Sequence, residues 1–91
     1  MNTLEYLLIS VGEEASEVGQ AASKCNRFTP DHAYYETSNL ARLQDEVTDL
    51  VTTLRRLEPL LGYTFKFEFS EAKSQRIDNM MKLSREMGTL V

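Results

Sequence analysis

The chain has 91 residues, which is enough for one small domain whose core lies near the lower limit for independent stability. Its composition is globular, with 42% hydrophobic and 26% charged residues, and its net charge of −4 argues against a nucleic-acid-binding module with a basic surface. The single cysteine, Cys25, excludes an internal disulfide or a cysteine-based zinc site, and the chain shows neither a membrane-length apolar run nor a signal-peptide pattern, so we expect a cytoplasmic protein.

The first predicted element is an amphipathic helix over about residues 3 to 25. Asn2 is its expected N-cap, with Glu5 placed three residues later as in a capping box. A polar connection follows over residues 26 to 36, in which Thr29-Pro30-Asp31 is expected to begin one short helical turn. The helix is indicated by apolar residues at spacings of three and four: Leu4, Leu7, Leu8, Val11, Ala15, Val18, Ala21, Ala22 and Cys25.

A second amphipathic helix is predicted from Thr37 or Ser38 to Glu58. Pro59 and Gly62 are expected to end it, because proline lacks a backbone donor and glycine favours the left-handed C-cap. The apolar stripe of this helix consists of Leu40, Leu43, Val47, Leu50, Val51, Leu54 and Leu57.

Residues 63 to 69 alternate aromatic and polar side chains with period two, which is typical of a strand. No other segment offers a partner strand, so we interpret these residues as an extended arm that packs four aromatics on one surface or pairs with another subunit. A third helix is then predicted from Ser70, its N-cap, to about Met87, with Gly88 as its stop. The expected fold class is all-α, with two long antiparallel helices plus a third helix in a single domain spanning residues 1–91.

Two acidic groupings interrupt the helical stripes, Glu13-Glu14-Ala-Ser-Glu17 and Asp45-Glu46-Val-Thr-Asp49. An advance of about 100° per residue places the last two acids of each grouping on one shoulder of its stripe and points the first acid away. A solvated acidic face is the plain interpretation of either motif alone. If the helices pack antiparallel, however, the two shoulders face each other and gather four carboxylates: Glu14, Glu17, Glu46 and Asp49.

Four carboxylates gathered in this way would repel one another, and burying them without partners is costly. A divalent cation resolves that conflict, and oxygen-only ligation is the preference of Mg²⁺ and Mn²⁺ rather than of zinc. Mg²⁺ that is held by carboxylates and open to water is a standard means of binding a polyphosphate. The sequence therefore predicts a Mg²⁺ site at these four residues, with Mn²⁺ as the alternative ion.

The pattern Glu13-Glu14-x-x-Glu17, followed after 28 residues by Glu46-x-x-Asp49, resembles the signature of the all-α nucleoside triphosphate pyrophosphohydrolases, the MazG-like family. The residues around both motifs look like those of its short, often phage-encoded members. The resemblance covers about residues 4 to 57 well and the third helix only loosely. It implies Mg²⁺-dependent hydrolysis of a nucleoside triphosphate to a monophosphate and pyrophosphate, with the metal held by Glu14, Glu17, Glu46 and Asp49.

The resemblance also implies a homo-oligomer, a dimer or a tetramer, which agrees with the thin core that three helices allow. Such a protein would act in the cytoplasm, or in the host cytoplasm if phage-encoded. Because the polar connection leaves little chain for an elaborate base pocket, the expected substrate is a purine or broadly defined (deoxy)nucleoside triphosphate, with dGTP or dATP as examples.

Within this interpretation, Glu17 or Glu46 is the expected catalytic group that orients or deprotonates the attacking water. Asn39 is a candidate for binding the base or ribose, or it merely occupies the first turn of its helix. Phe28, Tyr34, Tyr35 and Tyr63 are candidates for base stacking, although core or interface packing is the plainer expectation, and His32 is expected on a surface loop. The candidate phosphate-binding residues are Lys24, Arg27, Arg42, Lys73 and Arg76.

Two other classes of protein fit the same sequence. One is a non-catalytic helical interaction protein with a structural metal site, and the other is a regulator that binds a nucleotide without cleaving it. Metal-dependent release of pyrophosphate separates the enzyme from both. Nothing in the sequence indicates a nucleic-acid or membrane partner, because it has neither a basic stripe nor a helix that pairs a basic face with an apolar one.

Overall fold

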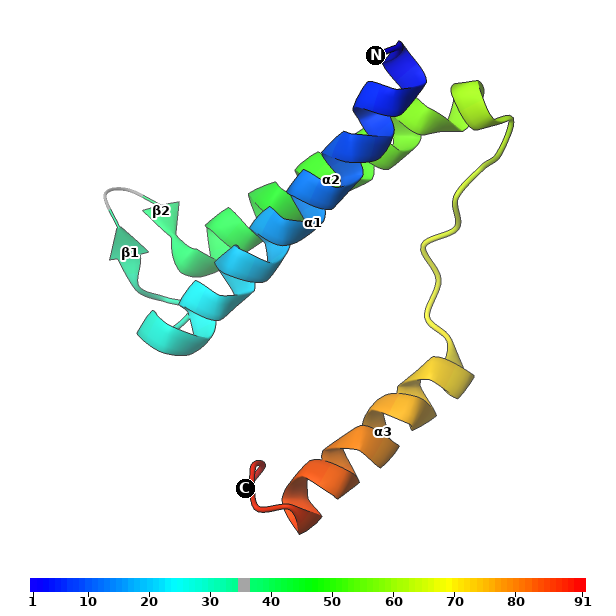
Figure 1. Ribbon diagram of the computed structural model, residues 1–91. Helices are drawn as coiled ribbons and strands as arrows, with labels where there is room; N and C mark the ends of the chain where they lie inside the picture. Colours follow the sequence, from blue (N-terminus) through cyan, green and yellow to red (C-terminus); the bar gives the residue numbers. More distant parts are fainter. Residues whose placement is uncertain (35–36) are drawn as a thin grey trace.

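The computed structural model describes residues 1–34 and 37–91. The described residues form three α-helices, α1 (Thr3–Phe28), α2 (Asn39–Leu61) and α3 (Glu71–Glu86), and two short strands, β1 (Ala33–Tyr34) and β2 (Thr37–Ser38). α1 and α2 lie side by side and antiparallel, whereas α3 lies apart at the end of an extended segment (Figure 1). The predicted all-α class is confirmed.

Helix α1 begins where the sequence predicts, because the Oδ1 of Asn2 accepts a hydrogen bond of 2.8 Å from the backbone N–H of Glu5. Its last residue is Phe28, a little later than expected. The C-cap residue is Thr29, whose φ of 72° is uncommon for a β-branched residue. The carbonyl oxygen of Thr29 accepts a bond of 3.1 Å from the side-chain Nδ2 of Asn39. This bond ties the end of α1 to the start of α2.

The expectation of a short helical turn at Thr29-Pro30-Asp31 is wrong. The chain instead turns into a small antiparallel sheet, in which β1 pairs with β2. The carbonyls of Pro30 and His32 accept hydrogen bonds from the backbone N–H groups of Leu40 and Asn39, at 3.1 and 2.9 Å. The first N–H groups of an α-helix have no acceptor within their own helix, so those of α2 donate to these two carbonyls of the preceding turn.

Helix α2 is capped by Ser38, whose Oγ accepts a hydrogen bond of 3.1 Å from the backbone N–H of Ala41. The expectation that Pro59 stops the helix is wrong, because Pro59 lies inside its last turn. The fixed φ of proline suits a helix, and one missing donor near the end removes only a single helical hydrogen bond. Gly62 ends the helix as predicted, with a left-handed φ of 62° and its N–H directed to the carbonyl of Glu58.

The apolar core lies between α1 and α2 and is thin. Ala21 and Leu57 are the buried apolar residues among those described, and most other members of the two apolar stripes are half-buried. Asn39 is also buried, at 4% exposure, where it links the two helices. In the described part of the chain, no helix combines the length and the apolar character needed to cross a membrane.

The aromatic arm is extended, as predicted (Figure 1). Hydrogen bonds join its start to the end of α2. The carboxylate of Glu58 accepts hydrogen bonds from Arg55 Nη1 at 2.8 Å and from the backbone N–H of Phe65 at 2.7 Å. The Phe65 ring packs edge-on against Tyr63 and is half-buried. The expectation that all four aromatics pack on one surface is met only in part, because Tyr63, Phe67 and Phe69 are exposed.

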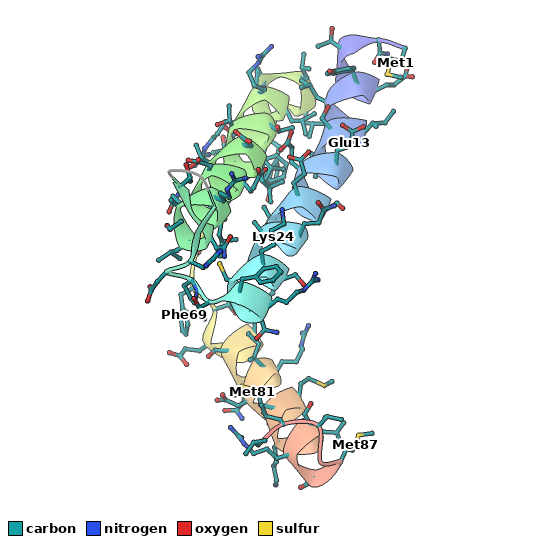
Figure 2. The ribbon with its side chains drawn as sticks, turned by 90° about the vertical axis from the view of Figure 1, so that its left-hand side faces the viewer. Met1, Glu13, Lys24, Phe69, Met81 and Met87 are labelled. Atoms are coloured by element: carbon teal, nitrogen blue, oxygen red, sulfur yellow. The ribbon has the colours of Figure 1, made fainter. Side chains whose placement is uncertain are left out.

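Helix α3 begins at its predicted N-cap, Ser70, whose Oγ accepts a bond of 3.3 Å from the N–H of Lys73. No residue of α3 is buried, and it does not pack along α1 or α2. Figure 2 shows Met81 on α3 and Met87 at its end, away from the helical pair. The exposed apolar residues of α3 and its C-cap are Ile77, Met80, Met81, Leu83 and Met87.

The overall shape is extended. The radius of gyration is 16.6 Å, whereas a compact chain of this length has a radius of gyration of about 12 Å. The accessible surface is 7375 Å², compared with about 5,400 Å² for a compact monomer of the same mass. This shape, together with the exposed apolar residues, suggests oligomerisation.

Candidate metal centre

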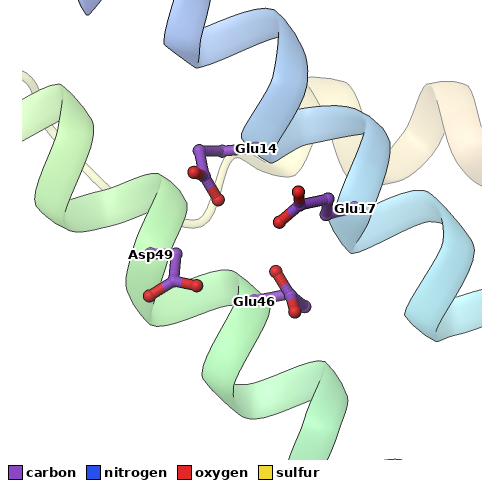
Figure 3. A group of neighbouring side chains, drawn as sticks. All are labelled: Glu14, Glu17, Glu46 and Asp49. Carbon is purple, nitrogen blue, oxygen red and sulfur yellow. The ribbon is translucent and has the colours of Figure 1, made fainter.

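Four carboxylates meet between α1 and α2, and we name them the carboxylate cluster. Glu14 and Glu17 come from α1, and Glu46 and Asp49 from α2, and each offers an oxygen that lies within 4.8 Å of the others (Figure 3). The spacing of three residues within each helix places both of its acids toward the partner helix, and the antiparallel packing brings the two pairs together. Glu13 and Asp45 are exposed and lie outside the cluster, in agreement with their helical phase.

No ion pair neutralises the carboxylate cluster among the residues that the structure describes. The Oε2 atoms of Glu14 and Glu46 are buried and have no hydrogen-bond partner in the described structure. The ion pair found among the described side chains joins Arg55 to Glu58, and neither residue belongs to the cluster. Buried carboxylate oxygens without partners are costly, and an oxygen-only set of this kind suits Mg²⁺ or Mn²⁺. The residues present therefore fit a divalent cation.

The electrostatics of the cluster show the same strain. Burial raises the pKa of Glu14 above its ordinary value, and the negative charges of Glu17 and Asp49 raise it further. The pKa of Glu46 is raised first by the adjacent carboxyl group of Glu17, because two neighbouring carboxyl groups are favoured when one of them keeps a proton. Burial and the neighbouring negative charges then add to this effect. A bound cation would offset the repulsion between the carboxylates and favour their ionised forms.

A cavity of about 270 Å³ opens beside the cluster, and we name it the carboxylate cavity. Glu17 and Glu46, the candidate catalytic residues, both line it. Arg42 is half-buried, and its Nε atom is buried without a hydrogen-bond partner in the part of the chain that is described. The sequence-predicted residues that the structure brings to this cavity are Glu17, Lys24, Asn39, Arg42 and Glu46.

Other candidate residues lie elsewhere. Arg27 is exposed and lines a hollow along α1 that shares Gln20 and Lys24 with the carboxylate cavity. Arg27 does not line the carboxylate cavity itself, and its guanidinium carbon lies 5.6 Å from the ring centroid of Phe28. Lys73 and Arg76 lie on α3, which the chain does not bring to its own carboxylate cluster (Figure 1). The side chain of Tyr34 and the whole of Tyr35 fall outside the described residues, and Tyr63 packs on the arm.

Phe28 is one of the candidates for base stacking, whereas His32 is a residue that sequence reasoning did not place near the site. They line a second cavity, of about 340 Å³, together with Lys24, Asn39 and Arg42, and we name it the aromatic cavity. Their position depends on the turn after α1 and on the bond between Asn39 and Thr29, for which the sequence offers no signal. The interpretation of His32 as an exposed residue of the connection is confirmed.

Comparisons with protein-family models, with curated proteins and with solved structures gave no significant match. What the fold and the site define is an all-α protein of three helices in its described residues, with an acidic cluster between α1 and α2 that could hold a divalent cation.

Proposed function

We propose that the protein is a Mg²⁺-dependent nucleoside triphosphate pyrophosphohydrolase of the MazG-like type. It would consist of one domain over residues 1–91 and act in the cytoplasm. Its substrate would be a (deoxy)nucleoside triphosphate, such as dGTP or dATP, and its products the monophosphate and pyrophosphate. The observation that carries this proposal is the meeting of four carboxylates beside a cavity that also contains Lys24 and Arg42.

The cavity combines the two kinds of charge that polyphosphate binding requires. Glu14, Glu17, Glu46 and Asp49 would hold Mg²⁺, which when bound neutralises part of the polyphosphate charge. Lys24 and Arg42 line the same cavity as Glu17 and Glu46, and their cationic groups would donate hydrogen bonds to phosphate oxygens. The buried Nε of Arg42, which has no partner among the described residues, is one such donor.

The reaction requires a water to be deprotonated close to the α phosphorus. Glu17 and Glu46 both line the cavity, so either carboxylate can accept the proton as the water oxygen attacks. The bond between the α phosphorus and the oxygen that bridges it to the β phosphorus then breaks, and pyrophosphate leaves with that oxygen. Lys24 and Arg42 stabilise the negative charge that develops on the phosphate oxygens.

The proposed enzyme is a homo-oligomer, a dimer or a tetramer. Most of the stability of a helix in a protein comes from the packing of its apolar face, and α3 buries no residue within its own chain. The accessible surface exceeds that of a compact monomer by about 2,000 Å², which is more than the roughly 800 Å² per partner that a standard interface buries. A second copy would cover this surface, and in that assembly Lys73 and Arg76 could approach the cluster of another subunit.

The test is a panel of ribo- and deoxynucleoside triphosphates incubated with Mg²⁺, with the products separated by ion-exchange chromatography. We expect monophosphate and pyrophosphate, and the order of rates would name the substrate. Diphosphate and orthophosphate would assign a different reaction. If the folded, oligomeric protein binds a nucleotide but releases no product, the nucleotide-binding regulator is the better description. If it neither binds a nucleotide nor releases a product, the interaction protein is favoured.

A further inference from the structure

We infer that the aromatic cavity is the binding pocket for the nucleobase of the substrate. This inference rests on the proposed function, because the carboxylate cluster then fixes where the phosphates lie. The aromatic cavity measures about 340 Å³ and is lined mainly by apolar surface, with Phe28 and His32 as its aromatic members. Its chemistry therefore differs from that of the carboxylate cavity, which is lined mainly by polar surface.

The two cavities are neighbours, since Lys24, Asn39 and Arg42 line both of them. Along α1, the order of side chains is thus carboxylate at Glu17, cation at Lys24 and aromatic ring at Phe28. A nucleoside triphosphate has the matching order of metal-binding phosphates, remaining phosphate and sugar, and planar base. Glu17 and Phe28 are separated by about 16 Å of helix, which is comparable with the length of an extended nucleoside triphosphate.

Phe28 and His32 supply the surface for a planar ligand. Their ring centroids lie 6.4 Å apart with the planes tilted by 38°. The Phe28 ring is half exposed rather than packed into the core, so part of its surface is open to a base. Proteins commonly hold a base by stacking it on an aromatic side chain, and this contact is possible for any base because each base has a π-face.

Asn39 adds a polar contact with a defined direction. Its Nδ2 donates to the carbonyl of Thr29 at 3.1 Å, so the amide is oriented and its Oδ1 remains as an acceptor. An exocyclic amino group, as in adenine, guanine or cytosine, is the complementary donor. The pocket is therefore suited to a base that carries an amino group.

The test compares two ligands in the presence of Mg²⁺ by calorimetry. One is a dATP analogue with a methylene group between the α and β phosphorus atoms, which resists hydrolysis, and the other is inorganic tripolyphosphate, which has no base. In Phe28→Ala we expect binding of the analogue to weaken about tenfold or more, as the loss of one stacked base predicts. Binding of tripolyphosphate should not change.

Two further variants separate stacking from folding. Phe28→Tyr keeps an aromatic ring and should bind the analogue as the wild type does. Tyr6→Ala removes another exposed ring from α1, at 62% exposure, and should leave both ligands unaffected. If Phe28→Ala weakens both ligands equally or neither of them, or if the wild type binds the analogue no better than tripolyphosphate, the inference is overturned. A wild type that binds the analogue but hydrolyses no triphosphate refutes the proposed function and leaves the Phe28 comparison valid.

Discussion

Glu17 of α1 and Glu46 of α2 bring carboxylate oxygens within 4.8 Å of each other across the helical pair. The adjacent Glu17 carboxyl group is the main cause that raises the pKa of Glu46. The same two residues line the carboxylate cavity, in which Lys24 and Arg42 also lie. Two facing carboxylates destabilise the fold at neutral pH when no cation is bound. A divalent cation would turn this repulsion into attraction, so folding stability, metal binding and pH are expected to be linked.

The raised pKa values of Glu14 and Glu46 give that linkage its sign. Both groups have an ordinary value of 4.5 and a higher pKa in the folded protein. Between the two values the folded state holds more protons than the unfolded state, so the free energy of unfolding falls as the pH rises. We expect the melting temperature of the metal-free protein to be higher at about pH 5 than at about pH 8, and Mg²⁺ to raise it more at the higher pH.

Calorimetry in the presence of a chelator and then with added Mg²⁺ measures both effects. Glu14→Gln should reduce the dependence on pH, because it removes one of the raised groups. The neighbouring Glu13→Gln is the matched control, since Glu13 is exposed and lies outside the cluster. A metal-free melting temperature that increases over this pH range would contradict the assigned electrostatics.

Neutral substitutions in the cluster should remove activity without unfolding the protein. Glu17→Gln and Asp49→Asn each delete a charge with almost no change in size, and we expect kcat/KM to fall by more than about 100-fold. Helicity measured by circular dichroism should persist, because each change also relieves repulsion between carboxylates. Asp45→Asn, on α2 but outside the cluster, should keep full activity. Unfolding of Glu17→Gln and Asp49→Asn would instead favour a structural metal site.

Arginine substitutions should separate the residues that line the carboxylate cavity from those that do not. Arg42→Gln should raise KM by about tenfold or more, since a hydrogen bond to a charged group contributes about 1.5–3 kcal/mol. Arg27→Gln should have a much smaller effect, because Arg27 is exposed and does not line the carboxylate cavity. Steady-state kinetics with the best substrate of the panel measures both. Equal effects of the two variants would contradict the placement of the phosphates.

The exposed apolar side of α3 should be required for assembly. Met80, at 57% exposure, lies on that side, and Met80→Glu should reduce the mass measured by light scattering to that of a monomer. Gln75→Glu is the matched control, because it adds the same charge about 140° around the helix. A wild type that is already monomeric, or a Met80→Glu variant of unchanged mass, would contradict the proposed oligomer.

Much of the fold follows from local sequence patterns. The spacing of apolar residues predicts α1 and α2, and the capping residues Ser70 and Gly88 predict α3. Side-chain hydrogen bonds of Asn2, Ser38 and Ser70 begin the three helices. The helical phase of the acidic residues also predicts which four carboxylates meet. These features succeed because each depends on the geometry of a single helix or on the simplest antiparallel packing of two.

The features that the sequence does not predict depend on contacts between segments. The helical turn expected after α1 is replaced by a short sheet, because the carbonyls of Pro30 and His32 bind the start of α2. The same turn creates the aromatic cavity, so the position of Phe28 could not be predicted from helical phase alone. What covers α3 could not be predicted either, because within one chain this helix packs along neither α1 nor α2.

The most direct test of the proposed chemistry is hydrolysis of the best substrate in ¹⁸O-labelled water, followed by mass spectrometry of both products. Attack at the α phosphorus, beside the carboxylates of Glu17 and Glu46, requires the label to appear in the nucleoside monophosphate and not in pyrophosphate. Label in pyrophosphate would place the attack on the β phosphorus, and label in orthophosphate would place it on the γ phosphorus. Label in pyrophosphate would contradict attack at the α phosphorus, and label in orthophosphate would contradict pyrophosphohydrolase chemistry altogether.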